Sequence, residues 1–330
     1  MTKESLLSIS PIDGRYKNKT KKLENYFSEF ALIKTRVEVE IKWLLFLLNS
    51  KDFKFLPEIN NNQQKKIENI FINFDLKEAS KVKSIEKITN HDVKAIEIYI
   101  VKQLKSLRLS KLSEFVHICC TSEDINNLSY ALMIERYRTE YLIPTLKDFN
   151  KVLNKLAVKW ANISMLSFTH GQKASPTSLG KEFRNFVHRI NFHKNKISES
   201  KQAAKFNGAV GNFNAHHVLD PSINWPKVTN KFISSFNLEY SLVSSQIETK
   251  DNLVFLLSNI ENLNNVLLDL SKDIWLYISK DYLKQKISSN EVGSSTMPHK
   301  VNPIDFENAE GNLTLSNSLI PSIRNKMQIS

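Results

Sequence analysis

Hydrophobic residues recur along much of the chain at steps of three and four positions, the spacing that places them on one face of an α-helix. The longest such run predicts a helix over about 249–280. Its stripe consists of Leu253, Leu256, Ile260, Leu263, Leu267, Leu270, Ile274 and Ile278. An unbroken stripe of this length is typical of a long helix in a helical bundle.

Shorter runs of the same kind predict further helices. They cover about 24–48, 63–74, 145–160, 177–200 and 303–325. The alternation of polar and apolar positions that marks a β-strand is not sustained over any useful length. The sequence also has neither a short repeat nor the glycine fingerprint of a nucleotide-binding βαβ unit. The pattern therefore predicts a mainly α fold built on long helices.

Two threonines are each followed three residues later by an aspartate: Thr89 by Asp92, and Thr121 by Asp124. This is the spacing of a capping box, with aspartate in place of the usual glutamate, and it predicts a helix start at each threonine. The free N–H groups of a helix start can also bind an anion. Thr121 and the neighbouring Ser122 are therefore a candidate anion site as well as a cap.

Residues 293–302 read Gly-Ser-Ser-Thr-Met-Pro-His-Lys-Val-Asn and predict a polar loop, because Pro298 prevents a regular helix from running through them. Asn302 followed by Pro303 predicts a helix N-terminus directly afterwards. Lys300 stands just ahead of the free N–H groups of that terminus, which together favour a carboxylate or a phosphate. The alternative is an ordinary capped helix that follows a loop.

Composition limits the partners that the chain can have. The 330 residues are 41% hydrophobic and 24% charged, as in an ordinary globular protein, and carry a net charge of +12. Lysine is spread along the whole length, without an arginine-rich stripe or a nucleic-acid-binding motif, so we expect no nucleic-acid partner. No apolar stretch is long enough to span a membrane, and the first residues do not resemble a signal peptide.

The cysteine content indicates a reducing compartment. The two cysteines, Cys119 and Cys120, are adjacent, and neighbouring cysteines rarely meet the geometry of a disulfide. Neither belongs to a pattern typical of a metal site. We therefore expect a cytoplasmic protein without a disulfide framework.

The loop at 293–303 closely resembles the signature loop of the fumarase/aspartase superfamily, whose members eliminate fumarate from succinyl compounds. The version with His299 and Lys300 resembles the adenylosuccinate lyases rather than the fumarases or argininosuccinate lyases. The resemblance extends from residue 8 onward, with the motifs in the same order. It implies an N-terminal helical domain, 1–111, and a central helical-bundle domain, 112–330. Members of the family continue well beyond this point, so the resemblance also implies a chain truncated at its C-terminus.

The resemblance implies two catalytic residues: Ser294 as the base and His170, in Phe168-Thr169-His170-Gly171-Gln172, as the general acid. It also implies a set of substrate-binding residues. These are Arg15, Tyr16, Asn90, His91, Asp92, Thr121, Ser122, Gln246, Lys300 and Asn302. Residues 207–212, Asn-Gly-Ala-Val-Gly-Asn, resemble the turn that lines the substrate in the family, and we call them the Gly/Asn loop. Glycine-rich turns are more often plain connectors.

The implied reaction is a β-elimination that converts adenylosuccinate to AMP and fumarate and cleaves succinylaminoimidazole carboxamide ribotide in the same way. It needs a base, a clamp for the carboxylate that takes up the carbanion charge, and an acid for the leaving nitrogen. No metal or organic cofactor is required. In the family the conserved regions of one site come from three subunits, which implies a homotetramer with shared sites.

Two other functions stay open at this point. One is another fumarate-releasing lyase of the superfamily, which the sequence around Met297-Pro298-His299-Lys300 disfavours. The other is a non-catalytic helical oligomer or fragment. Two positions depart from the family pattern: Lys173 stands where proline is more usual, and Ser175 stands where threonine is. Neither change removes a reactive group.

Overall fold

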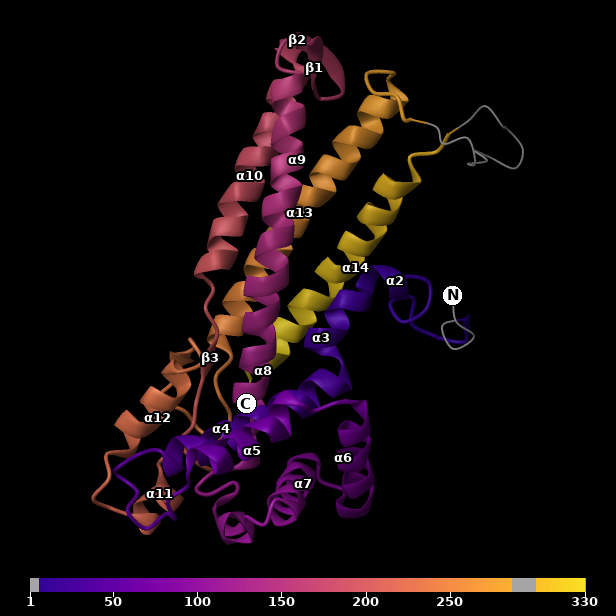
Figure 1. Cartoon of the computed structure of the whole chain (residues 1–330). Helices are drawn as coiled ribbons and strands as arrows, with labels where there is room; N and C mark the ends of the chain where they lie inside the picture. The colour runs from indigo at the N-terminus through magenta and orange to yellow at the C-terminus, as the bar shows by residue number, and fades with distance from the viewer. Residues whose placement is uncertain (1–5, 287–300, 330) are drawn as a thin grey trace. The chain divides into compact units, whose positions relative to one another are not determined.

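The computed structural model describes residues 6–286 and 301–329, and these are mainly helical, as the sequence predicted (Figure 1). They fall into two compact units, each built from two stretches of chain. Unit 1 consists of Met1–Tyr137 and Lys201–Thr249, and unit 2 consists of Arg138–Ser200 and Lys250–Ser330. The domain division expected at residue 111 from the family resemblance stays a prediction.

Unit 1 contains most of the shorter elements. In chain order these are α2 (Lys17–Thr20), η1 (Lys21–Leu23), α3 (Glu24–Phe27), α4 (Glu29–Leu48), α5 (Asn61–Ile72), α6 (Leu76–Thr89), α7 (Asp92–Ser106), η2 (Ser110–Phe115), α8 (Ser122–Arg136), β3 (Ala203–Ala204), α11 (Asn214–Leu219), α12 (Trp225–Ser234) and β4 (Glu239–Tyr240). Strands β3 and β4 form a short parallel pair. The helix predicted over 24–48 is interrupted at Ser28. This residue adopts an extended conformation and caps α4 by accepting a hydrogen bond from Ala31 N.

Helix α4 is the centre of unit 1, because it lies between two hydrophobic clusters. Ile41 and Leu44 belong to the cluster formed with α5, α6 and α7. Trp43 and Leu47 belong to the cluster formed with α8 and α12. The Trp43 ring centroid lies 4.7 Å from that of Phe206. A helix that is buried on more than one side also buries its polar residues, and those must find partners within the protein.

The segment around Thr89 corrects one prediction. Thr89 is the last residue of α6, a helix that the sequence analysis did not identify, and it donates its hydroxyl to Ile85 O. Asn90 then takes a left-handed conformation (φ 50°), and His91 is the N-cap of α7, with Nδ1 accepting from Lys94 N. The predicted cap at Thr89 is wrong because a threonine hydroxyl can bond back to its own helix instead of capping the next one.

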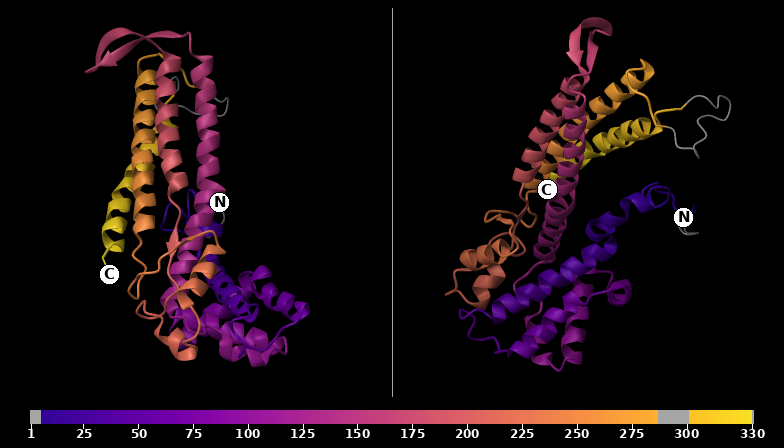
Figure 2. Two further views of the ribbon diagram at one scale, coloured as in Figure 1. Left: turned by 90° about the vertical axis from the view of Figure 1, so that its left-hand side faces the viewer. Right: turned by 45° about the horizontal axis from the view of Figure 1, so that its top comes forward.

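The described part of unit 2 contains four long helices, and a β-hairpin joins the first two of them. Its elements are α9 (Ile143–Lys159), β1 (Ser164–Thr169), β2 (Gln172–Ser178), α10 (Leu179–Glu199), α13 (Asp251–Ser279) and α14 (Ile304–Met327), and a π-helical turn, η3 (Tyr137–Leu142), precedes α9. Helix α10 packs against α9 and α13, and α13 packs against α14 (Figure 1; Figure 2). The long helix predicted over 249–280 is confirmed as α13.

Two predicted features of unit 2 change in the structure. Residues 164–178 form an antiparallel hairpin, although no useful strand was expected. Ser175 and Pro176 lie in β2 and do not start a helix; α10 begins at Leu179, with Ser178 accepting from Lys181 N. Proline suits both a first helical position and a short exposed strand, so the sequence signal was ambiguous. In the part of the chain that is described, no helix is long and apolar enough to cross a lipid bilayer.

Candidate active site

The predicted site residues divide between the two units. Arg15, Tyr16, Asn90, His91, Asp92, Thr121, Ser122 and Gln246 belong to unit 1, whereas His170 and Asn302 belong to unit 2. Ser294 and Lys300 lie outside the described residues. Each unit is therefore considered for the part of the site that it carries.

The start of α8 carries the predicted capping box. Asp124 Oδ2 accepts a hydrogen bond from Thr121 N at 2.9 Å, which is the reciprocal half of the box. Thr121 and Ser122 are half-buried, and the acids Glu123 and Asp124 lie in the first helical turn. The prediction of a helix start at this threonine is confirmed. The hydroxyls of Thr121 and Ser122 lie at the start of α8, where the free N–H groups of the helix favour an anion.

Asp124 also ties this helix start to the Gly/Asn loop. Its Oδ1 forms an ion pair with Lys205 Nζ at 3.0 Å and accepts a hydrogen bond from Asn207 N at 3.2 Å. Its Oδ2 accepts from Gly208 N at 3.1 Å, beside the bond from Thr121 N. Lys205 Nζ donates in turn to Gly208 O at 2.7 Å. Two segments that the sequence proposed separately as substrate contacts are thus joined through one carboxylate.

The opposite side of the Gly/Asn loop contacts the chain just before Gln246. Asn207 Nδ2 donates to Leu242 O at 3.1 Å and to Ser244 Oγ at 2.9 Å. Gly211 has a φ of +80°, and a Cβ at this position would lie 2.1 Å from Ser244 O. Only glycine fits such a close approach in that conformation. Gln246, which is exposed, lies two residues after Ser244 in the chain.

The buried guanidinium of Arg36 links the predicted segment 90–92 to α8. Its Nη2 donates to Asp92 Oδ2 at 2.7 Å, and its Nε donates to Asn126 Oδ1 at 2.8 Å. Partial burial raises the pKa of Asp92, but the charge of Arg36, the hydrogen bond from Val93 N and the charge of His91 together hold that pKa below its usual value. The carboxylate beside His91 is thus ionised and fixed relative to α8. Sequence reasoning missed Arg36, because it stands among the other charged residues of 34–42 and the local pattern does not mark it as buried.

A second buried pair, Glu40 with His117, was also missed. His117 Nδ1 lies 2.6 Å from Glu40 Oε1, and the Glu40 side chain is completely buried. Burial lowers the pKa of His117, but the hydrogen bond to Glu40 and the charge of that carboxylate raise it above its usual value. His117 has a left-handed backbone (φ 62°) and begins the segment that leads to Thr121. This pair therefore fixes α4 to the chain just before the start of α8.

The two cysteines lie in the same segment and are both free thiols. Burial raises the pKa of Cys119 to about 11. Burial likewise raises the pKa of Cys120, whose Sγ donates to Ile118 O. A thiol with a raised pKa is a poor nucleophile at neutral pH. We therefore assign the two cysteines a structural role in the segment before α8 rather than a reactive one.

His170 lies at the tip of the β1–β2 hairpin in unit 2 and is exposed. Thr169 pairs with Gln172, so His170 and Gly171 form a two-residue turn, and both have positive φ, 54° and 73°. Positive φ at both central positions is the pattern of a type I′ turn, which matches the twist of the flanking strands. The turn therefore fixes the backbone of His170 at the exposed tip of the hairpin.

The hairpin is anchored at the end of α13. The Phe168 ring centroid lies 5.9 Å from that of Tyr282, and Lys280 Nζ lies 4.6 Å from the Phe168 centroid. Cation–aromatic contacts of this kind are favourable. Residues 280 and 282 stand shortly before 287–300, the stretch outside the described residues that contains Ser294.

The remaining predicted residues make simpler contacts. Tyr16 precedes α2 and donates its backbone N–H to Pro11 O at 2.9 Å, while Arg15 is exposed. Asn302 is half-buried and accepts from Ile304 N through its carbonyl oxygen at 2.9 Å. Helix α14 starts at Ile304 with Pro303 as its N-cap, one residue later than predicted. Such a difference is within the usual uncertainty of helix ends.

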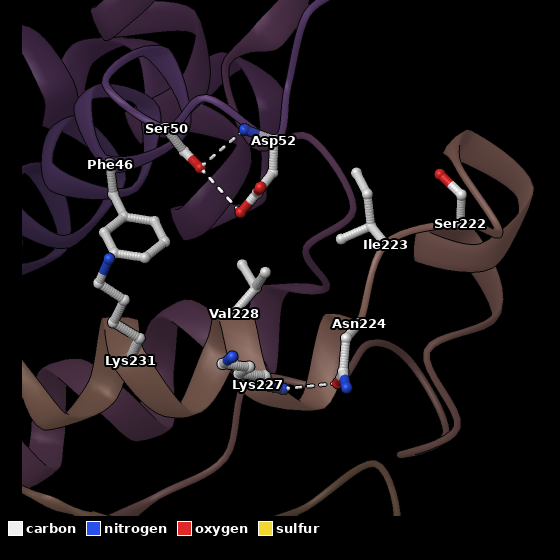
Figure 3. A pocket seen from close by; sticks show the side chains of 9 residues that line it. All are labelled: Phe46, Ser50, Asp52, Ser222, Ile223, Asn224, Lys227, Val228 and Lys231. Atoms are coloured by element: carbon white, nitrogen blue, oxygen red, sulfur yellow. Dashed lines mark hydrogen bonds between the residues drawn. The ribbon is translucent and has the colours of Figure 1, made fainter.

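Unit 1 also has a surface pocket of about 460 Å³ between the end of α4 and the start of α12 (Figure 3). It is lined by Phe46, Ser50, Asp52, Ser222, Ile223, Asn224, Lys227, Val228 and Lys231. These residues are different from those that the sequence singled out. Within residues 6–286 and 301–329, no group of three or more His, Cys, Asp or Glu side chains is arranged to hold a metal ion.

Comparison with known proteins identifies the family. The sequence model of the lyase family matches residues 14–315. The adenylosuccinate lyase of Buchnera aphidicola subsp. Schizaphis graminum is 46% identical over all of this chain and 73% of its own length. That of Legionella pneumophila (strain Corby) is 47% identical over 99% of this chain and 72% of its own length. The chain belongs to the adenylosuccinate lyase family. The Escherichia coli K12 member is 40% identical over all of this chain.

Family membership confirms the predicted lyase function and does not favour the alternatives of a sister lyase or a non-catalytic protein. The chain spans 72–73% of the length of these adenylosuccinate lyases. Among solved structures, the 3-carboxy-cis,cis-muconate lactonizing enzyme from Pseudomonas putida matches 93% of this chain and 66% of its own, with a TM-score of 0.71 and 19% identity. At that identity the match supports the fold alone, which agrees with the mainly α prediction.

Proposed function

We propose that this chain carries the β-elimination site that releases fumarate from adenylosuccinate, giving AMP, and from succinylaminoimidazole carboxamide ribotide. The structural observation that carries the proposal is the meeting of the α8 start and the Gly/Asn loop at Asp124. It gathers hydroxyls, free helix N–H groups and a glycine turn, a combination suited to an anionic substrate.

The chemical step divides between two residues. Ser294, as the alkoxide, takes a proton from the carbon next to the substrate carboxylate. The electron pair of that C–H bond forms the double bond of fumarate, and the bond from the neighbouring carbon to nitrogen breaks. His170 gives its proton to the leaving nitrogen, which becomes the amine of AMP. A serine hydroxyl ionises poorly in water, so Lys300 and the start of α14 must stabilise the alkoxide.

Binding is assigned to the other predicted residues. Thr121, Ser122, Lys300 and Asn302 hold the carboxylate into which the carbanion charge spreads. Arg15 offers a planar fork for phosphate, and Tyr16 offers an aromatic face. These two residues, with 90–92 and Gln246, select the purine ribotide. The reaction so written uses no metal, organic cofactor or nucleic acid.

A homotetramer with sites shared between subunits is part of the proposal. Helices α13 and α14 expose large apolar side chains, including Phe255 (50% exposed) and Trp275 (44% exposed). Leu315, Leu319 and Ile323 of α14 are likewise exposed. Burying such residues in an interface is favourable by about 25 cal/mol per Å² of apolar surface. We place the assembly in the cytoplasm, where Cys119 and Cys120 would stay reduced.

The test is the absorbance change on cleavage of each substrate by wild type, His170→Ala and Ser294→Ala. It is made with the chain as printed and with the chain extended by the remaining segment of the Buchnera relative. Each substitution removes one proton-transfer group, so turnover should fall roughly 10²–10⁴-fold, with substrate binding largely retained. His217→Ala and Ser80→Ala, at exposed positions, are the matched controls.

Mixing the two inactive variants tests the shared site. If one site uses residues from different subunits, hybrid tetramers will contain some sites with both proton-transfer groups intact, and part of the activity will return. Near-normal turnover by either single variant on both substrates would show that its assigned role is wrong. A mixture that stays as inactive as its components would contradict sharing of sites between subunits.

A further inference from the structure

We propose that Lys205 and Asp124 are positioning residues that hold the Gly/Asn loop against the start of α8. The inference rests on the proposed function, because the loop and Thr121-Ser122 are the segments assigned to the substrate. Both side chains are completely buried, so they act through the backbone that they bind rather than by touching the substrate.

The two side chains fix one residue, Gly208, on both of its peptide groups. Asp124 Oδ2 accepts from Gly208 N at 3.1 Å, and Lys205 Nζ donates to Gly208 O at 2.7 Å. Gly208 has a φ of +83°. In a free chain, glycine adopts this region of φ only as one of many accessible conformations. Two charge-assisted bonds therefore select one conformation where the sequence alone would permit several.

Removal of only one of the two charged side chains leaves the other as a buried charge without a partner. Lys205 has its ion-pair contact with Asp124 Oδ1 at 3.0 Å. The nearby ring of His216 cannot replace the carboxylate, because burial and the charges of His217 and Lys205 lower its pKa to about 4 and an imidazole above its pKa is neutral. A buried ion that loses its partner is strongly unfavourable, whereas removal of both ions is often tolerated. A single variant therefore loses stability through its unpaired charge, whereas the double variant tests the positioning role without that loss.

The backbone of Lys205 is fixed to α8 by a third residue, Asn127. Asn127 Oδ1 accepts from Lys205 N at 2.9 Å, and Asn127 Nδ2 donates to Lys205 O at 3.1 Å. The backbone of Lys205 is thus held by α8 itself, and its ammonium reaches forward to the glycine. The loop starts from a fixed point on α8 and returns to Asp124 on the same helix.

The experiment compares Lys205→Met, Asp124→Leu, which removes both acceptor oxygens at similar volume, and the double variant. Either single change should lower the free energy of unfolding, and the double variant should regain much of it because no unpaired buried charge remains. The loop, however, should stay unpinned in the double variant. We expect its kcat/KM to remain at least ~10-fold below wild type. Glu38→Gln with Arg136→Met is the matched control, since that ion pair lies at the far end of α8.

Amide hydrogen exchange gives a readout that does not depend on catalysis. Exchange at Asn207 N and Gly208 N should be at least ~10-fold faster in the double variant, while amides in the middle of α8 stay protected. Unchanged exchange at these two amides, or wild-type kcat/KM in a stable double variant, would overturn the positioning role. A wild-type chain inactive on both substrates would instead overturn the proposed function, and the exchange result would still decide whether the pair pins the loop.

Discussion

The Phe168 ring packs 5.9 Å from the Tyr282 ring, and this contact connects the hairpin that carries His170 to the chain just beyond α13. In the role of general acid that we propose for His170, a small displacement from the reacting group would lower the rate by orders of magnitude. The contact between Phe168 and Tyr282 therefore helps to hold the hairpin tip, and with it the backbone of His170, in place.

Phe168→Ala should therefore lower kcat more than it raises KM. The substitution removes the packing on Tyr282 and the contact with Lys280 Nζ, so the hairpin tip becomes less well placed. We expect a decrease of roughly 10-fold or more in kcat. Steady-state kinetics on adenylosuccinate measures it, and Phe192→Ala, at an exposed position of α10, is the control. Equal kinetics of the two variants would remove Phe168 from this role.

Gly180→Ala should destabilise unit 2. A Cβ at this position would lie 2.3 Å from Ala157 O and 2.6 Å from Ala161 Cα, which is too close for α9 and α10 to keep their packing. Overpacking commonly costs about 1–3 kcal/mol. The midpoint of denaturant unfolding should fall accordingly.

Gly311→Ala is the matched control for that experiment. Gly311 lies within α14, and a Cβ there would have no described atom within 4 Å. Alanine is favoured over glycine in a helix interior by up to about 1 kcal/mol, so stability should stay the same or rise. A fall as large as that of Gly180→Ala would mean that loss of glycine itself, rather than the contact with α9, is responsible.

Asp273→Asn should stabilise the protein at neutral pH. Burial and the neighbouring Asp269 and Glu182 raise the pKa of Asp273 to about 6 from its usual value of 3.8, although Arg189 acts in the opposite direction. The folded state therefore disfavours the charged form, which predominates above pH 6. As the pH falls through 6 toward 4, the wild type takes up this proton and the disadvantage disappears.

Thermal unfolding at several pH values measures this effect. The variant should have the higher Tm at pH 8, and its advantage should stay level down to about pH 6 and shrink as the pH falls from 6 to 5. Asp148→Asn, at an exposed position of α9, controls for removal of a negative charge from the same unit. An advantage that is constant over this range would show that Asp273 does not titrate as described.

Arg36→Lys should destabilise unit 1 despite the retained charge. The planar guanidinium reaches Asp92 Oδ2 and Asn126 Oδ1 with two different nitrogens, which a single ammonium cannot reproduce. Loss of a hydrogen bond to a charged group costs about 1.5–3 kcal/mol. Chemical unfolding of this variant and of Arg108→Lys, at an exposed arginine, makes the comparison. An equal, small effect at both positions would contradict the proposed link between α7 and α8.

The features that the sequence predicted well are those decided by neighbours along the chain. The stripe of α13 and the box of Thr121 with Asp124 use residues at most a few positions apart. The same local signal failed at Thr89, because its hydroxyl had a second local choice, a bond back to Ile85 O. The hairpin at 164–178 was missed because Pro176 fits either element.

The parts of the site that could not be predicted depend on partners distant in sequence. Lys205 lies 81 positions from Asp124, and Arg36 lies 56 positions from Asp92. Nothing in the local pattern shows which buried charge will meet which. What the sequence could indicate is the need for a partner, since a charged residue within an apolar stretch is rarely left alone.

The division of each unit between two stretches of chain has a consequence for synthesis on the ribosome. Residues 138–200 emerge before 201–249, which complete unit 1, and long before α13 and α14, which complete unit 2. The apolar faces of the α9–α10 pair therefore stay exposed while unit 1 is completed and until α13 and α14 have been synthesised. Exposed faces of this kind are prone to aggregation in nascent chains. Slow translation across residues 201–280 would lengthen that interval, and a chaperone acting there would benefit the yield more than the final stability.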